Sequence, residues 1–237
     1  YLPDEIKCDF MSLDMLFICL PTDLVFYFKE IFSKSNILVN KIICSSYAKS
    51  INYKDNLNLC GNRLFIDVGF NKTSIVSYCG DKIILLDVLP IGGNDITKDI
   101  SKILEIELKR SEEMKRNFNS NLKLSSGNDI LIETLQKIIF ARTEEIFELC
   151  IKSIKSNLRT FGKFKIILMG EGSKIFDSHN KDKILFLNDV DLLVETTEDI
   201  CKSGFKSITK LNKQEVVVVP KKQIKLGFFE RFFLFFS

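Results

Sequence analysis

Short apolar runs that alternate with amphipathic segments place the strongest constraint on how this chain can fold. Met15–Leu20 (MLFICL), Asn36–Cys44 (NILVNKIIC) and Lys165–Met169 (KIILM) each have the length and composition of a buried strand. A helix is predicted to begin at Thr22, and a second, short helix is predicted around Tyr47–Ile51. The resulting strand–helix–strand–helix order predicts an α/β domain.

The middle of the chain predicts a meander of strands followed by helices. The expected strands are Leu64–Val68, Ile75–Tyr78 and Lys82–Leu89, and the Asn-Lys and Gly-Asp turns between them favour antiparallel hairpins. After them come a helix, a turn and a long helix, at Asp95–Leu104, around Lys109–Asn117, and from Asp129 to about Leu158. Apolar residues of the long helix approximate helical spacing: Ile132, Leu135, Ile139, Ile146, Leu149 and Ile154.

Composition argues against two classes of site. The net charge of +3 is small and dispersed over 237 residues, and basic runs with interleaved aromatics are confined to the C-terminal segment, so nucleic-acid binding is not predicted. The seven cysteines form no CxxC pair, and the single histidine, His179, gives a zinc site little to build on. An odd cysteine count indicates reduced thiols.

Two glycine turns have the composition of a phosphate-binding site. In FIDVGFNKTSIV, Asp67 ends a strand and Gly69 occupies the turn, where a carboxylate can hold Mg²⁺ or its water while turn amides face phosphate. In PIGGNDITKDI, Gly92 and Gly93 precede a helix whose N-terminal amides can face an anion. The alternative for the second motif is a glycine turn before a capped helix.

A third glycine turn and a charged helical segment extend this pattern. In ILMGEGSK a buried strand runs into Gly170 and Gly172, which lack a Cβ and let the backbone approach a flat ligand. In SEEMKR, Glu112 and Lys115 stand at i, i+3 with Arg116 beside them. Such a pair can hold a ribose hydroxyl and an adenine edge, or form only a surface ion pair. The order of all four signals favours a nucleotide cleft.

The final residues, KKQIKLGFFERFFLFFS, predict a helix with one broad phenylalanine face. Its apolar run is shorter than the roughly 20 residues that span a bilayer, so the helix is expected to lie in the headgroup plane. The alternative is a terminal helix docked on the protein's own core. The residues expected to contact lipid are Phe228, Phe229, Phe232, Phe233, Phe236, Lys225 and Arg231.

Taken in order, these stretches resemble the actin and heat-shock chaperone ATPase superfamily, and most closely the bacterial cell-division family FtsA. FIDVGFNKTSI resembles the second phosphate loop, SEEMK the adenosine-side A-E-x-x-K, and ILMGEGS the adenosine loop, while LPIGGNDITKDI, ARTEEIFEL and LGFFERFFLFF also follow the family pattern. The sequence departs from this pattern at Phe70, Asn71 and Glu171, where the family has glycines.

The resemblance implies a partial actin-like (ribonuclease H-like) ATPase fold with a C-terminal amphipathic helix. It assigns residues 1–52 to the end of a small partner-binding subdomain and the return strand–helix of the first lobe. The second lobe, a linker and the membrane helix follow at 53–204, 205–220 and 221–237. The matched stretches correspond to about the second half of a typical member, so a first phosphate loop is expected upstream of Tyr1.

By the same resemblance, ATP and Mg²⁺ are the expected cofactors, with Asp67 at the metal. The implied nucleotide-binding residues are Asp67, Gly69, Gly92, Gly93, Glu112, Lys115, Gly170, Gly172 and Ser173.

The implied function is that of an adaptor without enzymatic turnover. It tethers the tubulin-like protein FtsZ to an anionic membrane surface, at the cytoplasmic face of the inner membrane in the division septum. Self-assembly into an actin-like polymer and contacts with other divisome proteins are also implied, with the FtsZ-binding face in the lobe containing residues 95–125. Two alternatives remain, a small-molecule kinase of the same superfamily and the related actin-like pilus assembly protein.

Overall fold

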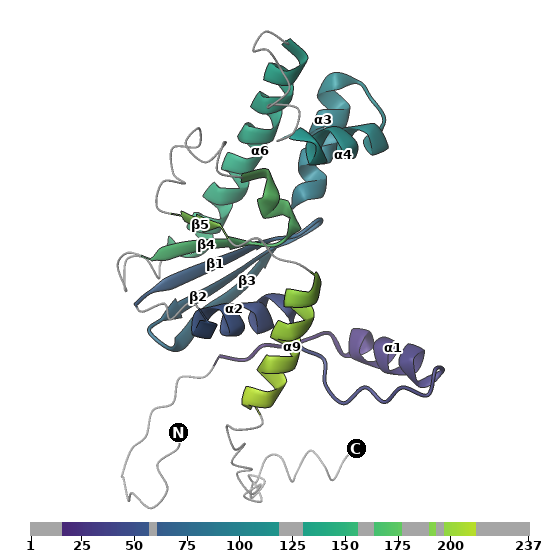
Figure 1. The fold of residues 1–237 in the computed structure, drawn as a ribbon, viewed down its shortest axis with the longest axis vertical. Helices are drawn as coiled ribbons and strands as arrows, with labels where there is room; N and C mark the ends of the chain where they lie inside the picture. Colours follow the sequence, from purple (N-terminus) through teal and green to yellow (C-terminus); the bar gives the residue numbers. More distant parts are fainter. Residues whose placement is uncertain are drawn as a thin grey trace, which may run out of the picture.

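A computed structural model describes residues 16–56, 61–118, 130–155, 164–176, 190–192 and 197–211, and the structural statements below concern these residues. Five strands form one sheet between two layers of helices (Figure 1). The strands are β1 (Arg63–Val68), β2 (Thr73–Cys79), β3 (Lys82–Leu89), β4 (Lys165–Met169) and β5 (Val190–Leu192). Above the sheet lie α3 (Gly93–Leu104), α4 (Leu108–Arg116) and α6 (Ile130–Ser153). Below it lie α2 (Ser45–Asn56) and α9 (Thr197–Leu211), and α1 (Thr22–Ser33) projects to one side.

The sheet has the order β3-β2-β1-β4-β5. The hairpins β1–β2 and β2–β3 are antiparallel, as predicted, and Gly80 adopts a positive φ of 58° in the tight turn before β3. β4 is parallel to both β1 and β5, so the chain crosses over the sheet through α3, α4 and α6 between β1 and β4. The carboxyl ends of β1 and β4 therefore lie side by side, with Asp67 opposite Met169.

Side-chain alternation along the strands divides the core between the two faces of the sheet. In β1, Leu64, Ile66 and Val68 belong to the larger cluster, which includes Ile96 and Ile100 of α3 and the buried face of α6. Phe65 points the other way and packs with Tyr53 of α2 in the smaller cluster. Asp67, two residues after Phe65, consequently faces α2 rather than the upper helices.

Two predicted strands are wrong. Residues 16–20 and 37–44 form no strand, and several of their apolar side chains are exposed, with Leu38 at 84%. An apolar run becomes a strand only when a neighbouring strand accepts its backbone hydrogen bonds, and neither segment pairs with the described sheet, whose edges are β3 and β5. Asn36 adopts a left-handed φ of 57°, which also interrupts an extended backbone.

The helix predictions are largely confirmed. α1 begins at Thr22, as predicted. α2 is longer at both ends than the short helix predicted around Tyr47–Ile51, and α6 covers most of the predicted long helix. Helix α4 covers the segment expected as a turn around Lys109–Asn117. Residues 205–211, expected to begin a linker, instead belong to α9. Residues 212–220, the phenylalanine-rich segment 221–237 and His179 lie outside the described residues.

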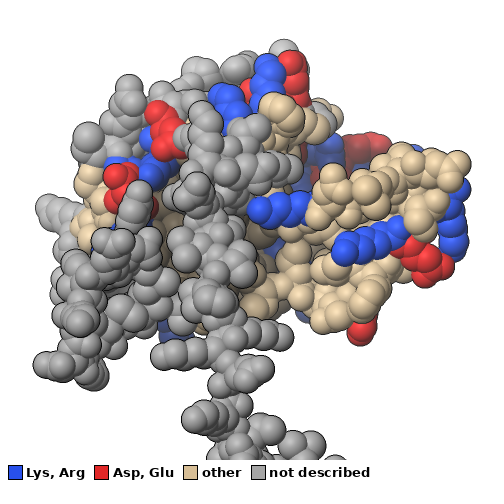
Figure 2. Space-filling model, turned by 90° about the horizontal axis from the view of Figure 1, so that it is seen from below, with Lys and Arg blue, Asp and Glu red and all other residues tan. Residues whose placement is uncertain are grey.

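Helix α1 differs from the other helices because the structure buries none of its residues. Phe26 and Tyr27 are about two-thirds exposed, at 66% and 61%. Figure 2 shows this projection at the right as a mostly uncharged surface with charged side chains at its rim. No helix among the described residues is both long and apolar enough to cross a bilayer. Cys19, Cys44, Cys79, Cys150 and Cys201 are free thiols.

Candidate functional site

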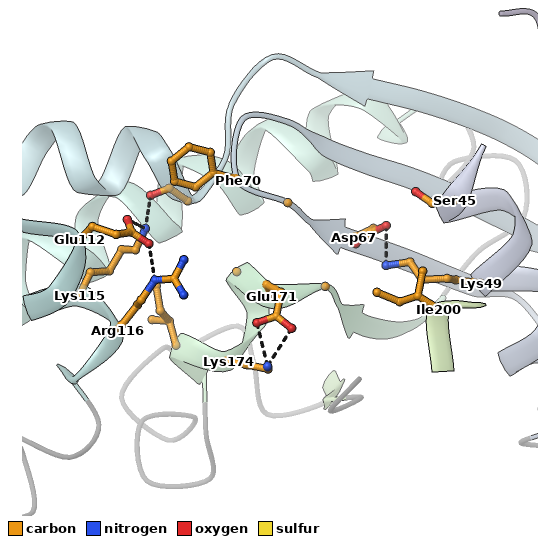
Figure 3. A pocket seen from close by; sticks show the side chains of 15 residues that line it. Ser45, Lys49, Asp67, Phe70, Glu112, Lys115, Arg116, Glu171, Lys174 and Ile200 are labelled. Atoms are coloured by element: carbon orange, nitrogen blue, oxygen red, sulfur yellow. Dashed lines mark hydrogen bonds and ion pairs between the residues drawn. The ribbon is translucent and has the colours of Figure 1, made fainter. Parts of the chain in front are cut away.

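A cavity of about 620 Å³ opens where the carboxyl ends of β1 and β4 meet α2, α4 and α9 (Figure 3). Seven of the nine predicted nucleotide-binding residues line it: Asp67, Gly69, Gly93, Glu112, Lys115, Gly170 and Gly172. The parallel pairing of β1 with β4 explains part of this convergence, because it places Asp67 and Gly69 at the same edge of the sheet as Gly170 and Gly172. Lys49, Phe70, Arg116, Glu171 and Lys174 also line the cavity.

The N-terminus of α3 is docked on the turn that follows β1. The Gly93 N–H donates to the Gly69 carbonyl at 2.9 Å, and the Asn94 N–H donates to the Phe70 carbonyl at 2.7 Å. The Gly92 N–H donates to the carboxylate of Asp95 at 3.0 Å. A Cβ on Gly92 would lie 2.6 Å from the Gly69 carbonyl oxygen, so this contact requires glycine. These amides are already bonded, and the alternative of a glycine turn before a capped helix describes this motif.

Glu112 and Lys115 form a partly buried network that joins α4 to α3. The Lys115 Nζ donates to the Gly93 carbonyl at 2.7 Å, to Thr97 Oγ1 at 2.7 Å and to Glu112 Oε2 at 2.6 Å. Thr97 Oγ1 donates to the same carboxylate oxygen at 2.5 Å, and Arg116 Nε donates to Glu112 Oε1 at 2.8 Å. The predicted i, i+3 pair therefore exists, and it holds two helices together instead of lying free on the surface.

The network keeps Glu112 ionised. Burial alone raises the pKa of its carboxyl, but hydrogen bonds from Lys115, Thr97 and Arg116 outweigh burial and lower the pKa from 4.5 to about 2. Burial lowers the pKa of Lys115, an effect that Glu112 opposes. Arg116 lines the cavity, and its side chain is 71% exposed. In Figure 3 its guanidinium points into the space between α4 and Glu171.

Asp67 is held by α2. Its Oδ2 lies 2.8 Å from the Nζ of Lys49 and accepts a 2.7 Å hydrogen bond from the hydroxyl of Ser46. Mg²⁺ requires near-octahedral oxygen coordination, and this carboxylate oxygen already faces an ammonium group. Among the described residues, no group of three or more His, Cys, Asp or Glu side chains is placed to hold a metal. Oδ2 could reach a metal only if Lys49 moved, and the role of Asp67 as a metal ligand stays a prediction.

Gly170, Gly172 and Ser173 pack the turn after β4 against β1. Gly170 has a φ of +90°, and a Cβ there would lie 2.4 Å from Asp67 Oδ1. A Cβ on Gly172 would meet the side chain of Val68 at 2.6 Å. Ser173 is buried and donates its hydroxyl to the Gly170 carbonyl at 2.6 Å. On their Cβ side these glycines face protein, so the close approach predicted for a flat ligand is made there by the chain itself.

Two of the three departures from the family glycines, Phe70 and Glu171, have visible consequences. Phe70 is 53% exposed at the cavity, where its ring centroid lies 5.7 Å from the Lys115 Nζ. The carboxylate added by Glu171 pairs with Lys174 at 2.7 Å. Sequence reasoning missed Lys49 and Lys174. Ser46 and Lys49 share a helix face by their i, i+3 spacing, but nothing in the sequence indicates that this face meets Asp67.

Part of this chain matches a known protein family. Residues 64–148 match the model of the family "Cell division protein FtsA". A protein of that name from Buchnera aphidicola subsp. Schizaphis graminum (strain Sg) is 32% identical over 108 residues, which cover 44% of this chain and 25% of that protein. This stretch of the chain resembles FtsA. The chain spans about a quarter of the length of this curated relative.

Solved structures show that the chain has an actin-like fold. MreB5 of Spiroplasma citri, bound to ADP, superposes with a TM-score of 0.59 at 16% identity, over 82% of this chain and 68% of that one. A PilM-PilN type IV pilus biogenesis complex gives 0.57 at 17% identity, over 76% and 53%. Ta0583, an archaeal actin homolog, gives 0.50 at 14% identity, over 70% and 54%.

Proposed function

We propose that this chain acts as an FtsA-like cell-division adaptor. It attaches FtsZ filaments to the cytoplasmic face of the inner membrane at the septum, alongside other divisome proteins. One observation carries the proposal: the stretch that matches FtsA, residues 64–148, includes the turn after β1 and helices α3 and α4, which contribute residues to the cavity of an actin-like fold. The actin-like fold also supports self-assembly into a polymer.

We infer that the cavity binds ATP. Its volume of about 620 Å³ is within the 300–1,000 Å³ typical of ligand sites. Phe70 offers an exposed ring and Arg116 an exposed guanidinium to a ligand in the cavity. The MreB5 neighbours are described as bound to ADP and to AMPPNP. In this proposal ATP controls self-assembly and is not turned over.

We assign the membrane contact to residues 221–237. Burying one phenylalanine stabilises an anchor by roughly 1.5–3 kcal/mol, and lysines on the same segment favour anionic headgroups by about 1 kcal/mol each. Several half-buried rings therefore suffice for reversible attachment, which suits an adaptor that is recruited to one site and released.

Recruitment of FtsZ to vesicles tests the adaptor function. The whole chain and fluorescent FtsZ are mixed with vesicles of phosphatidylglycerol and phosphatidylethanolamine and then sedimented. We expect both proteins in the pellet, and we expect both to be lost from it with Phe232→Glu and Phe233→Glu. The control, Gln223→Glu with Ser237→Glu, adds the same two charges to the segment but keeps its phenylalanines, and should retain binding.

Two outcomes contradict the proposal and differ from each other. If the Phe232→Glu, Phe233→Glu variant sediments with vesicles as well as the unchanged chain, the phenylalanine face is not the anchor. If the chain binds vesicles but never brings FtsZ with it, the anchor stands and the adaptor function fails.

A further inference from the structure

The carboxylate that was expected to bind a divalent cation, Asp67, forms an ion pair with Lys49 of this chain. Because side chains alternate along β1, Asp67 faces α2, where Ser46 and Lys49 stand three residues apart on one helix face. Ser46 Oγ and Lys49 Nζ lie 2.7 and 2.8 Å from the same oxygen, Asp67 Oδ2. In Figure 3 the Lys49 ammonium points at this carboxylate from the wall of the cavity.

This pair is built into the fold. The side chains of Lys49 and Asp67 are only 5% and 10% exposed, so little water screens their attraction. The other carboxylate oxygen lies beside Gly170, where even a Cβ would approach to 2.4 Å. A metal at Asp67 would have to displace the ammonium, leaving a buried cation without its carboxylate, which is a strongly unfavourable state.

The charges of the remaining lining residues favour an anionic ligand. Lys115 is paired with Glu112 and Lys174 with Glu171, while Arg116 shares Glu112 and keeps a largely exposed side chain. Four cations and three carboxylates line the cavity, so one positive charge is left for phosphate oxygens once Lys49 has neutralised Asp67. Without Lys49 the same wall would carry equal numbers of both charges.

We propose that Lys49 takes the place of a divalent cation, so that ATP binds in this cavity without Mg²⁺. This inference rests on the proposed binding of ATP. Lys49 offsets the charge of Asp67, which is the electrostatic task that a bound metal would otherwise perform near the phosphates.

Titration of the whole chain with fluorescently labelled ATP, once in millimolar Mg²⁺ and once in EDTA, tests the proposal. We expect dissociation constants that agree within about threefold, a difference of less than 1 kcal/mol. Binding that is more than about tenfold weaker in EDTA overturns the inference while leaving the proposed ATP binding intact. Absence of binding in both buffers at millimolar ATP overturns both.

Two substitutions separate a lysine-neutralised carboxylate from a metal ligand. Asp67→Asn removes one negative charge, so in millimolar Mg²⁺ ATP should bind as tightly as to the unchanged chain or more tightly; if Asp67 were a metal ligand, this variant would lose affinity in Mg²⁺. Lys49→Gln leaves Asp67 unpaired, so affinity in EDTA should fall by about tenfold or more, and Mg²⁺ should restore it. Unchanged affinity of Lys49→Gln in EDTA contradicts the proposal.

Lys54→Gln is the matched control, because Lys54 lies on the same helix and pairs with Asp81 at 2.8 Å, away from the cavity lining. Its affinity for ATP should equal that of the unchanged chain in both buffers. If either single variant fails to fold by circular dichroism, the double variant Lys49→Gln, Asp67→Asn removes both buried charges together. It should bind ATP equally in Mg²⁺ and EDTA, and a requirement for Mg²⁺ would overturn the inference.

Discussion

The carboxylate of Glu112 accepts hydrogen bonds from three side chains, those of Lys115, Thr97 and Arg116. Its folded pKa of about 2 lies below the ordinary value of 4.5. A carboxylate with a lowered pKa stabilises the fold fully above its unfolded pKa. This contribution is lost as the pH falls from about 4.5 toward about 2.

Replacing Glu112 with glutamine should reduce both stability and its dependence on pH. Because buried Lys115 loses its charged partner, the free energy of unfolding should fall by about 1–3 kcal/mol at neutral pH. The gap between Glu112→Gln and the unchanged chain should narrow below a pH of about 4.5, as measured by urea unfolding monitored by circular dichroism. Glu113→Gln, on the exposed side of α4, should stay within about 0.5 kcal/mol at every pH. A constant gap across the acid range would contradict the role of ionised Glu112.

Gly170 allows backbone strain to be distinguished from a steric clash. Its φ of +90° is nearly matched by Gly61 at +86°, but a Cβ on Gly61 would meet no atom within 4 Å, whereas one on Gly170 would strike Asp67 and Val68. Both alanine variants should lose about 1–3 kcal/mol from the strained backbone. Gly170→Ala should lose clearly more because of the clash, and equal losses in thermal unfolding would show that Gly170 tolerates a side chain.

At the scale of elements, the sequence predicted those parts of the fold in which local pattern and packing agree. β1 alternates Leu64, Ile66 and Val68 against Phe65, and both hairpins of the meander follow turn residues, so strands and pairing were foreseen. Residues 16–20 and 37–44 are as apolar as strands, but no described strand pairs with them. Composition indicates that a segment can be buried, but it does not show which strand the segment would pair with.

The same limit explains why only part of the site could be predicted from the sequence. The glycine turns and the Glu112–Lys115 pair were predicted from spacing along the chain, and the structure brings seven of the nine predicted residues to one cavity. The occupied amides of α3 and the Lys49–Asp67 pair depend on how elements dock, which no spacing reports. The docking of α2 beneath β1 places Asp67, the predicted metal ligand, in an ion pair with Lys49.

Helix α1 should be nearly dispensable for stability, because none of its side chains is buried. Phe26→Ser should change the free energy of unfolding by no more than about 0.5 kcal/mol. Phe147 of α6 is 3% exposed in the larger core cluster, and Phe147→Ala should cost about 3–5 kcal/mol. Urea unfolding of the two variants measures the contrast, and a cost above about 2 kcal/mol for Phe26→Ser would mean that α1 packs against the protein in solution.

At the scale of the whole molecule, the proposal that one chain carries an actin-like body and a lipid-binding segment implies a particular form of binding curve. A single shallow helix attaches weakly and reversibly, whereas a polymer presents many helices at once and converts each further attachment into an intramolecular step. Such linkage can raise the apparent affinity by a factor of about 10²–10⁴ without any new contact. The body would therefore determine how strongly the segment holds the membrane.

Membrane binding by the whole chain should accordingly be cooperative in protein concentration, whereas a peptide of residues 221–237 should bind hyperbolically. Sedimentation with phosphatidylglycerol vesicles over a range of protein concentrations measures both curves. We expect the whole chain to reach half-saturation at a concentration at least about a hundredfold lower than the peptide. Raising the salt concentration should weaken both by screening the lysines and leave the ratio nearly unchanged, because chain linkage does not depend on charge. If the two curves superimpose, the actin-like body contributes no avidity, and self-assembly on the membrane would have to be abandoned as part of the function.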